Sequence, residues 1–232
     1  MKLRLAKHGN HALTLMETLV IIVVLAFLAA LFFDMGPGGQ RKAKKISCEN
    51  NLKQVALAIK IWSGDSGDRY PMAVSITNGG AMEWMLTTNA WKVFGVMSNE
   101  LSTPKVIYCP QDALHGRPAT NFTDDLKNQI SYFIGAEASD VDPQLLLAGD
   151  DNFLLNQSPI CPGLIDPASN DMLKWDDSRH VEVKKQDWFN QDKKINYGNV
   201  ALTDGSVQSF TSSGLTNALH QASLAPNRLV IP

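Results

Sequence analysis

Hydrophobic residues form one long unbroken stretch near the N-terminus of the chain. From Thr18 to Phe33 no residue is charged, and nearly all are Val, Ile, Leu, Ala or Phe. Counted from Leu13, the stretch has the length of about 20 residues that a helix needs to cross a bilayer. The cations that precede it place the N-terminus in the cytoplasm; they are Lys2, Arg4 and Lys7. The pattern predicts a single transmembrane helix over residues 13–33, with the C-terminal body on the far side of the membrane.

Glu17 is the one acid inside this apolar stretch. An acid costs about 2.5–3.5 kcal/mol at the middle of a bilayer and less near its edge, and ionisable groups in such segments usually have a function. A plain membrane anchor leaves Glu17 unexplained. A cleaved secretory signal would have a shorter apolar core and small residues at its end, where this chain has Phe32 and Phe33. We therefore expect the stretch to do more than tether the chain.

A break and a second helical pattern follow the apolar stretch. Pro37 and the glycines within residues 34–39 loosen or kink a helix. Apolar residues then return at helical spacing up to residue 63, with most lysines elsewhere; they are Ile46, Leu52, Val55, Ala56, Ile59 and Trp62. We predict a kinked amphipathic continuation of the helix over residues 34–63, which packs on a globular head formed by residues 64–232.

Short strands separated by turns are predicted in the second half of the head. Strands are expected over 130–135 and 145–149. The clearest hairpin lies over 199–210, where Asp204-Gly205 suits a tight turn. A last short helix is expected over 213–222. The predicted fold is therefore α+β, with one long N-terminal helix packed on a small antiparallel sheet.

Three other segments of the head have a weaker pattern. Residues 82–97 suggest a short helix and a buried strand, whose aromatic residues Trp84, Trp91 and Phe94 we expect in the core rather than on a ligand platform. Residues 106–112 suggest a short buried strand, and the polar residues 164–191 suggest a long surface excursion.

Composition excludes several classes of protein. The chain has 232 residues and a formal charge of -2, which argues against a nucleic-acid-binding protein. No nucleophile elbow, zinc-protease motif, phosphate-binding loop or dinucleotide-binding fingerprint is present. We therefore expect no enzymatic activity and no nucleic-acid partner.

The three cysteines allow at most one internal disulfide. Cys48 lies on the predicted helix, whereas Cys109 and Cys161 each precede a proline in a predicted loop. An oxidising compartment permits a disulfide. We predict a Cys109–Cys161 pair, with three buried free thiols as the alternative, because sequence alone does not fix connectivity.

The first part of the chain resembles a known processing signal. The block Ala-Leu-Thr-Leu-Met-Glu over residues 12–17, with a basic leader before it and an apolar run after it, is similar to the prepilin signature of type IV pilins and type II secretion pseudopilins. The resemblance implies cleavage between Ala12 and Leu13, methylation of the new amine at Leu13, and Glu17 as the fifth residue of the mature chain. The family usually has Gly and Phe where this chain has Ala12 and Leu13.

Three further motifs resemble a pseudopilin-like subfamily. Residues 47–54 match S-C-x-x-N-L-K-Q, residues 109–112 match C-P-x-D, and residues 198–207 match G-N-V-A-x-x-D-G-S-V. The subfamily often has a histidine ten residues before the aspartate of the last motif. This chain has Lys194 there, and its nearest upstream histidine is His180.

The resemblance implies a structural subunit of a pilus-like or pseudopilus filament. It implies a leader at residues 1–12 that a prepilin peptidase removes, and a single-pass subunit in the inner membrane with its head in the periplasm. The implied partners are membrane lipid, further copies of the chain, other pilin-like subunits and an inner-membrane assembly platform. In the filament, Glu17 would pair with the N-terminal amine of a neighbouring subunit and set the register.

The sequence leaves two alternatives open. The chain can be a membrane-tethered periplasmic binding module that does not polymerise.

Some major pseudopilins hold calcium near the C-terminus, so the carboxylates of Asp150, Asp151 and Asp204 are candidate calcium ligands. The simpler interpretation is that these acids cap turns, so that the protein needs no cofactor.

Overall fold

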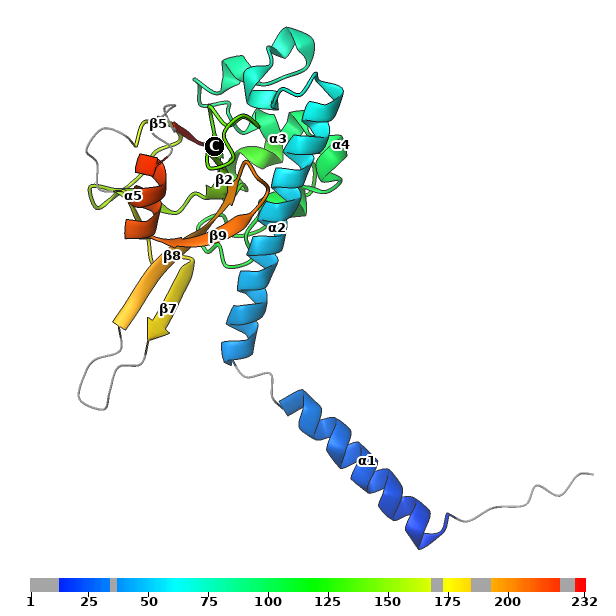
Figure 1. Cartoon of the computed structure of the whole chain (residues 1–232). Coiled ribbons are helices and arrows are strands. Elements are labelled where there is room, and N and C mark those ends of the chain that lie inside the picture. Colours follow the sequence, from blue (N-terminus) through cyan, green and yellow to red (C-terminus); the bar gives the residue numbers. More distant parts are fainter. Residues whose placement is uncertain (1–12, 34–36, 168–172, 185–192, 222–227) are drawn as a thin grey trace, which may run out of the picture. The chain divides into compact units, whose positions relative to one another are not determined.

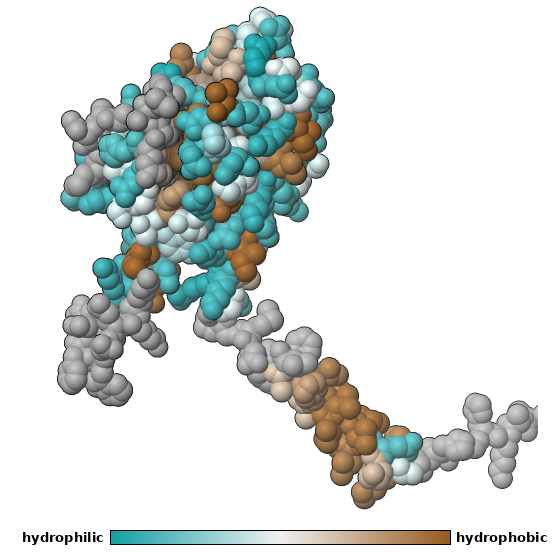
Figure 2. Space-filling model, in the orientation of Figure 1, coloured by the Kyte–Doolittle hydropathy of each residue, from teal (hydrophilic) through white to brown (hydrophobic). Residues whose placement is uncertain are grey.

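The computed structural model describes residues 13–33, 37–167, 173–184, 193–221 and 228–232 (Figure 1). The chain forms two compact units, with the boundary between Lys42 and Ala43. The first unit contains helix α1 (Leu15–Phe33), whose surface is almost entirely hydrophobic (Figure 2). Among the described residues, no helix has both the length and the apolarity required to cross a membrane.

Helix α2 (Pro37–Asp65) begins at a proline. Proline is well suited to the first position of a helix, where its missing N–H would have no partner and its fixed φ is already helical. The structure describes two helices where the sequence predicted one kinked helix over residues 13–63. Residues 34–36 lie outside the described residues.

The part of α2 in the second unit packs on the head through one face. Its fully buried positions follow the spacing of three and four residues that defines a helix face; they are Cys48, Leu52, Val55, Ala56, Ala58 and Ile59. The predicted apolar stripe is confirmed at Leu52, Val55, Ala56 and Ile59. The prediction for Ile46 is wrong, because its side chain is 56% exposed.

The head is built around a seven-stranded antiparallel sheet, as the α+β prediction required. Its main path has the order β5-β10-β1-β2-β8-β7, and β9 pairs with β8. A separate three-stranded sheet has the order β4-β3-β6. The strands are β1 (Tyr132–Gly135), β2 (Leu146–Asp150), β3 (Phe153–Leu155), β4 (Ser158–Pro159), β5 (Gly163–Ile165), β6 (Leu173–Trp175), β7 (His180–Lys184), β8 (Lys193–Leu202), β9 (Val207–Thr211) and β10 (Leu229–Ile231).

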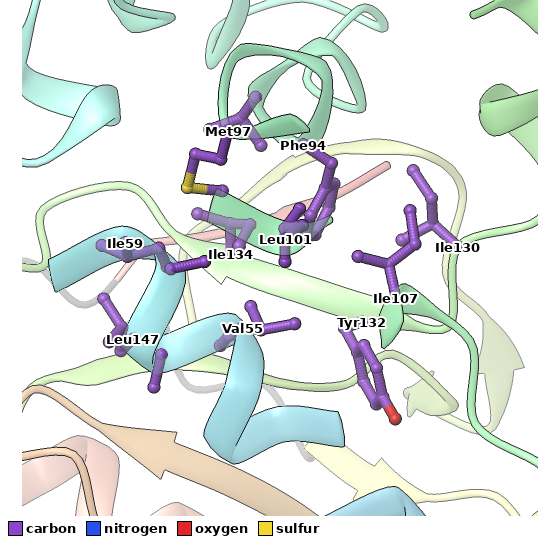
Figure 3. Packing of buried hydrophobic residues seen from close by; sticks show 14 of the residues in the cluster. Val55, Ile59, Phe94, Met97, Leu101, Ile107, Ile130, Tyr132, Ile134 and Leu147 are labelled. Atoms are coloured by element: carbon purple, nitrogen blue, oxygen red, sulfur yellow. The ribbon is translucent and has the colours of Figure 1, made fainter. Parts of the chain in front are cut away.

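Both faces of the large sheet are covered, so its central strands are hydrophobic on each side. Tyr132 and Ile134 of β1 belong to the core that α2 covers, where Val55 and Ile59 approach them (Figure 3). Phe133, between them, belongs to a second core under β3, β6 and helix α5 (Ser212–Gln221). The period of two along each strand thus divides the side chains between the two cores.

Short helices form the segment between α2 and β1. Helix α3 (Lys92–Val96) is followed by α4 (Ser98–Leu101), and a 3₁₀ turn covers Pro104–Ile107. The strands predicted within residues 82–97 and 106–112 are therefore wrong. At the second of these, Thr103 accepts a hydrogen bond from the N–H of Lys105, and Pro104 occupies the first position, so the chain starts a helical turn.

The C-terminal part of the chain confirms the strands over 130–135 and 145–149, the hairpin and the last helix. Gly205 has φ of +88° in the β8–β9 turn, a conformation that glycine adopts at little cost. The surface excursion predicted over 164–191 is wrong in its described part, because β6 and β7 lie within it. Trp175 of β6 is only 2% exposed.

Candidate functional site

The start of α1 is fixed by a reciprocal pair of hydrogen bonds between Thr14 and Glu17. Glu17 Oε2 accepts hydrogen bonds from Thr14 N at 2.9 Å and from Thr14 Oγ1 at 3.1 Å, and Glu17 N donates to Thr14 Oγ1 at 3.3 Å. This is a capping box, which satisfies backbone donors that the first turn leaves free. Glu17 therefore has a role within its own chain that the sequence analysis did not predict.

The predicted processing site adjoins this cap. Leu13 and Thr14 precede the first helical residue, so the amine that cleavage would create lies outside the helix. Ala12 and the leader 1–12 lie outside the described residues. Glu17 is the third residue of α1, close to the N-terminal end of the chain that cleavage would leave.

Apolar side chains of α1 are exposed along the whole described part of the helix. The exposed fractions include 80% for Leu15, 65% for Ile22 and 66% for Phe27. Exposed apolar surface of this extent is rare on a soluble monomer and marks a surface that another molecule covers. The helix can therefore bind lipid or other apolar helices.

A buried arginine connects three segments of the head. Arg179 Nη2 lies 2.7 Å from Asp112 Oδ2 and 2.5 Å from Asp151 Oδ1, and Arg179 Nη1 donates to the carbonyl of Ser131 at 2.6 Å. Arg179 and Asp112 are each 6% exposed. The residues come from the segment before β7, the loop after Cys109 and the ends of β1 and β2, so this cluster holds the loop and both strand ends together.

His115 extends the cluster toward solvent. Its Nδ1 lies 2.6 Å from Asp112 Oδ2, and Ser131 Oγ donates to the same oxygen at 2.5 Å. Burial alone would raise the pKa of Asp112, but the hydrogen bond from His115, the charge of Arg179 and the hydrogen bond from Ser131 hold this pKa well below its usual range.

The pKa values of His115 and Asp151 in this cluster are shifted in the opposite direction, upward. Burial lowers the pKa of His115, but its hydrogen bond to Asp112 and the charge of Asp151 outweigh burial, so the pKa of His115 is raised. Burial raises the pKa of Asp151 more than the charge of Arg179 lowers it. The cluster therefore favours a protonated His115 and an ionised Asp112.

A second buried group lies beside the first. Asp150 Oδ2 accepts hydrogen bonds from Asn199 N at 2.7 Å and from Asn199 Nδ2 at 3.2 Å, and it lies 3.1 Å from His180 Nε2. His180 is fully buried and stacks on Tyr197 with a centroid distance of 5.3 Å. These contacts join β2, β8 and β7, which are neighbours in this order in the sheet.

The disulfide joins Cys48 of α2 to Cys109, with a Cα–Cα distance of 5.0 Å. The predicted Cys109–Cys161 pair is therefore wrong, and Cys161 is an exposed free thiol. The reason is that α2 shares a core with the residues before Cys109, and Asn51 Nδ2 donates to the carbonyl of Tyr108 at 2.8 Å, which brings together two cysteines 61 residues apart. The alternative of three free thiols is also wrong.

The geometry brings one group of possible metal ligands together. Within the described part of the chain, Cys48, Cys109 and His180 offer ligand atoms within 4.8 Å of one another. The two sulfur atoms are joined in the disulfide, so neither is a thiolate, which is the form that binds metal. In this oxidised state the group is part of the core and not a metal centre.

The predicted calcium ligands are not brought together. Asp150 ends β2 and Asp151 binds Arg179, whereas Asp204 lies in the β8–β9 turn at the other end of β2, where its N–H donates to the carbonyl of Pro143 at 3.3 Å. Asp204 Oδ1 accepts a hydrogen bond from Ser206 N at 2.7 Å. The prediction of a calcium site from these three acids is wrong. The carboxylate of Asp204 instead stabilises the β8–β9 turn through its hydrogen bond with Ser206 N.

The sequence contained part of the signal for the buried cluster. Asp112 belongs to the C-P-x-D motif and Asn199 to the last motif, but neither had a predicted role. His180 was noted only as the histidine nearest upstream of that motif, and nothing in a local pattern identifies Arg179 as buried. Lys194, which occupies the position of the family histidine, instead pairs with Val183 across the β7–β8 hairpin.

Comparison with known proteins adds no assignment. No protein-family model, curated protein or solved structure matches this chain.

Proposed function

We propose that this protein is a structural subunit of a filament of the type IV pilus or type II secretion pseudopilus kind. A prepilin peptidase cleaves it between Ala12 and Leu13, and the new amine at Leu13 is methylated. Copies of the chain, together with other pilin-like subunits, then associate through α1. The heads remain on the outside of the filament.

One observation carries the proposal: an apolar helix with uncovered side chains precedes a folded head. The head has its own two cores, and every described residue of α1 whose burial is known is exposed. Neither core contains a described residue of α1, so this helix remains available for association with copies of itself. Packing of apolar helices is the simplest way to cover such a surface.

Glu17 gives this association its register in the proposal. The capping hydrogen bonds hold Glu17 Oε2 at the start of α1. The second oxygen can accept a hydrogen bond from the amine of Leu13 in a neighbouring copy. A buried charge pair of this kind specifies alignment more than it adds stability.

The membrane part of the proposal rests on the sequence. The uncharged run from Thr18 to Phe33 and the basic leader favour a subunit held in the inner membrane before assembly, with its N-terminus in the cytoplasm and its head in the periplasm. An assembly platform in that membrane would draw subunits into the filament. The periplasm would also permit the Cys48–Cys109 disulfide.

Processing and assembly are tested together with wild type and two variants. Intact mass and N-terminal sequencing of protein from its native membrane should give a chain that starts at Leu13 with one methyl group on its amine. Glu17→Ala should still be found in the membrane fraction but be lost from the sheared surface fraction. Glu49→Ala, which removes an acid on α2, is the matched control and should assemble normally.

The alternative function gives different results in the same experiment. A tethered binding module that does not polymerise predicts no sheared material for the wild type, and no effect of Glu17→Ala. An uncut chain that starts at Met1 would contradict the proposed processing.

A further inference from the structure

A surface groove in the head is not explained by filament assembly. It lies between helix α3 and residues 122–123 and has a volume of about 570 Å³. Volumes of about 300–1,000 Å³ are typical of small-molecule sites. The groove is shallow and widely open to solvent, and it is lined by Trp84, Trp91, Lys92, Gly95, Val96, Phe122 and Thr123.

The aromatic residues of this segment are only partly used by the core. The sequence predicted all three aromatics of residues 82–97 in the core, and Phe94 is indeed fully buried. Trp91 is 9% exposed, and Trp84 is only partly buried at the edge of the same cluster. The groove is thus a hydrophobic surface on which the Trp84 ring is partly open to solvent, whereas the buried Trp91 forms part of its wall.

Lys92 gives the groove its charge. Its Nζ lies 5.3 Å from the centroid of the Trp84 ring and 5.6 Å from that of the Trp91 ring. Among the described residues that line the groove, it is the one ionisable side chain. The nearby acid Glu83 is bound elsewhere, because it accepts hydrogen bonds from Ser75 Oγ at 2.5 Å and from Ile76 N at 2.8 Å.

We propose that this groove binds an acidic sugar, a uronic acid unit of a polysaccharide. The C–H face of a pyranose ring packs on an aromatic face, and its carboxylate pairs with Lys92. Charge complementarity selects the acid, because no carboxylate among the described residues that line the groove pairs with Lys92. The open side favours a sugar over an aromatic acid, since a sugar keeps its hydroxyl groups in water whereas an aromatic ring gains most when both faces are enclosed.

Gly95 keeps the groove accessible. A Cβ added there would meet only the carbonyl oxygen of Phe122, at 3.7 Å, which is ordinary van der Waals contact. Alanine therefore fits without strain, whereas a leucine side chain would extend into the groove. Gly95→Leu is thus a variant that blocks the site without removing a core residue.

Titration calorimetry with the full chain in detergent tests the proposal. Trigalacturonate should bind saturably with a Kd on the order of 1 mM or tighter. The fully methyl-esterified trisaccharide, which has the same rings without charge, should bind at least about tenfold more weakly, since a charge-assisted contact is lost. Benzoate should also bind at least about tenfold more weakly, because it lacks the pyranose rings that pack on the Trp84 indole.

Variants separate the contribution of the site from that of folding. Lys92→Gln should weaken trigalacturonate at least about tenfold and leave the esterified sugar unchanged. Lys92→Arg should retain binding, Gly95→Leu should abolish it, and the exposed control Lys105→Gln should have no effect. Thermal unfolding of each variant confirms that the head is folded. Absence of binding by the wild type, equal affinity for the esterified sugar, or equal affinity for benzoate would overturn the proposal.

This inference is independent of the filament. A head that does not assemble can still bind the sugar, and an assembled filament can fail to do so. The calorimetric test can therefore contradict sugar binding without contradicting filament assembly, and the assembly test can contradict the filament without contradicting sugar binding.

Discussion

Arg179 Nη2 lies 2.7 Å from Asp112 Oδ2, and both side chains are fully buried. The pair joins the loop after Cys109 to the segment before β7. Burial of two charges is costly, so such a pair stabilises the fold only while each partner remains bound. The consequence is that the head depends strongly on a residue that no local sequence pattern identifies.

Removal of the arginine charge should destabilise the head severely. Arg179→Met leaves Asp112 and Asp151 buried without their partner, and we expect a loss of about 3–5 kcal/mol in the free energy of unfolding. Arg179→Lys should recover only part of this, because an ammonium group cannot reproduce the planar donor geometry. Urea unfolding of the three proteins measures the effect, and Lys105→Met at an exposed site should change the free energy by less than about 0.5 kcal/mol. A loss below about 1 kcal/mol for Arg179→Met would contradict the stabilising role of the buried Arg179 cluster.

His115 should make the stability of the head depend on pH. The pKa of His115 is raised in the folded state, so its protonated form stabilises the fold below about pH 6.5, the unfolded value, and this contribution is lost as pH rises through the folded pKa. His115→Gln should therefore lower the melting temperature more at pH 5.5 than at pH 9. Both pH values lie above the usual pKa of Asp112, which is ionised throughout. A difference in melting temperature that is constant or larger at pH 9 would refute this role.

The disulfide should stabilise the head by closing a long loop. The sequence separation of 61 residues predicts a contribution of about 4 kcal/mol from the lower entropy of the unfolded chain. The double variant Cys48→Ser/Cys109→Ser should lose most of this free energy, whereas Cys161→Ser should lose none. Peptide mapping without reductant should recover a peptide that links Cys48 to Cys109. A peptide that links Cys109 to Cys161 would disprove the pairing.

Gly198 should tolerate no side chain. A Cβ there would lie 2.3 Å from the Trp175 ring, which is itself stacked on Phe153 at a centroid distance of 4.6 Å. Gly198→Ala should therefore cost about 1–3 kcal/mol of stability through overpacking. Gly64→Ala is the matched control, because it lies in α2 with nothing within 4 Å, and it should stabilise by about 0.5–1 kcal/mol. Equal effects of the two substitutions would show that the Trp175 contact is not tight.

Features with a local cause could be predicted from the sequence. The buried face of α2, strands β1 and β2, and the Asp204-Gly205 hairpin follow from periodicity and turn chemistry, which depend on neighbours within a few residues. The 3₁₀ turn at Pro104 was missed because its buried apolar residues resemble a strand over so short a run. Helix and strand are not separable by periodicity at that length.

Features with a non-local cause could not be predicted. The partner of Cys109 depends on how α2 packs on the head, which no spacing encodes. Likewise, the acids Asp150 and Asp151 looked like metal ligands because their partners, His180 and Arg179, are distant in the sequence. The capping box is a local feature, because Thr14 and Glu17 have the spacing of three residues that this motif requires.

The central claim is that copies of this chain form a filament through α1. Electron microscopy of the sheared surface fraction, labelled with antibody against the head, tests it most directly in cells that express wild type or Glu17→Ala. We predict labelled filaments for the wild type and none for the variant, with equal amounts of the two proteins in the membrane. Labelled filaments of equal number in both, or wild-type protein that is present and processed but never filamentous, would contradict the account.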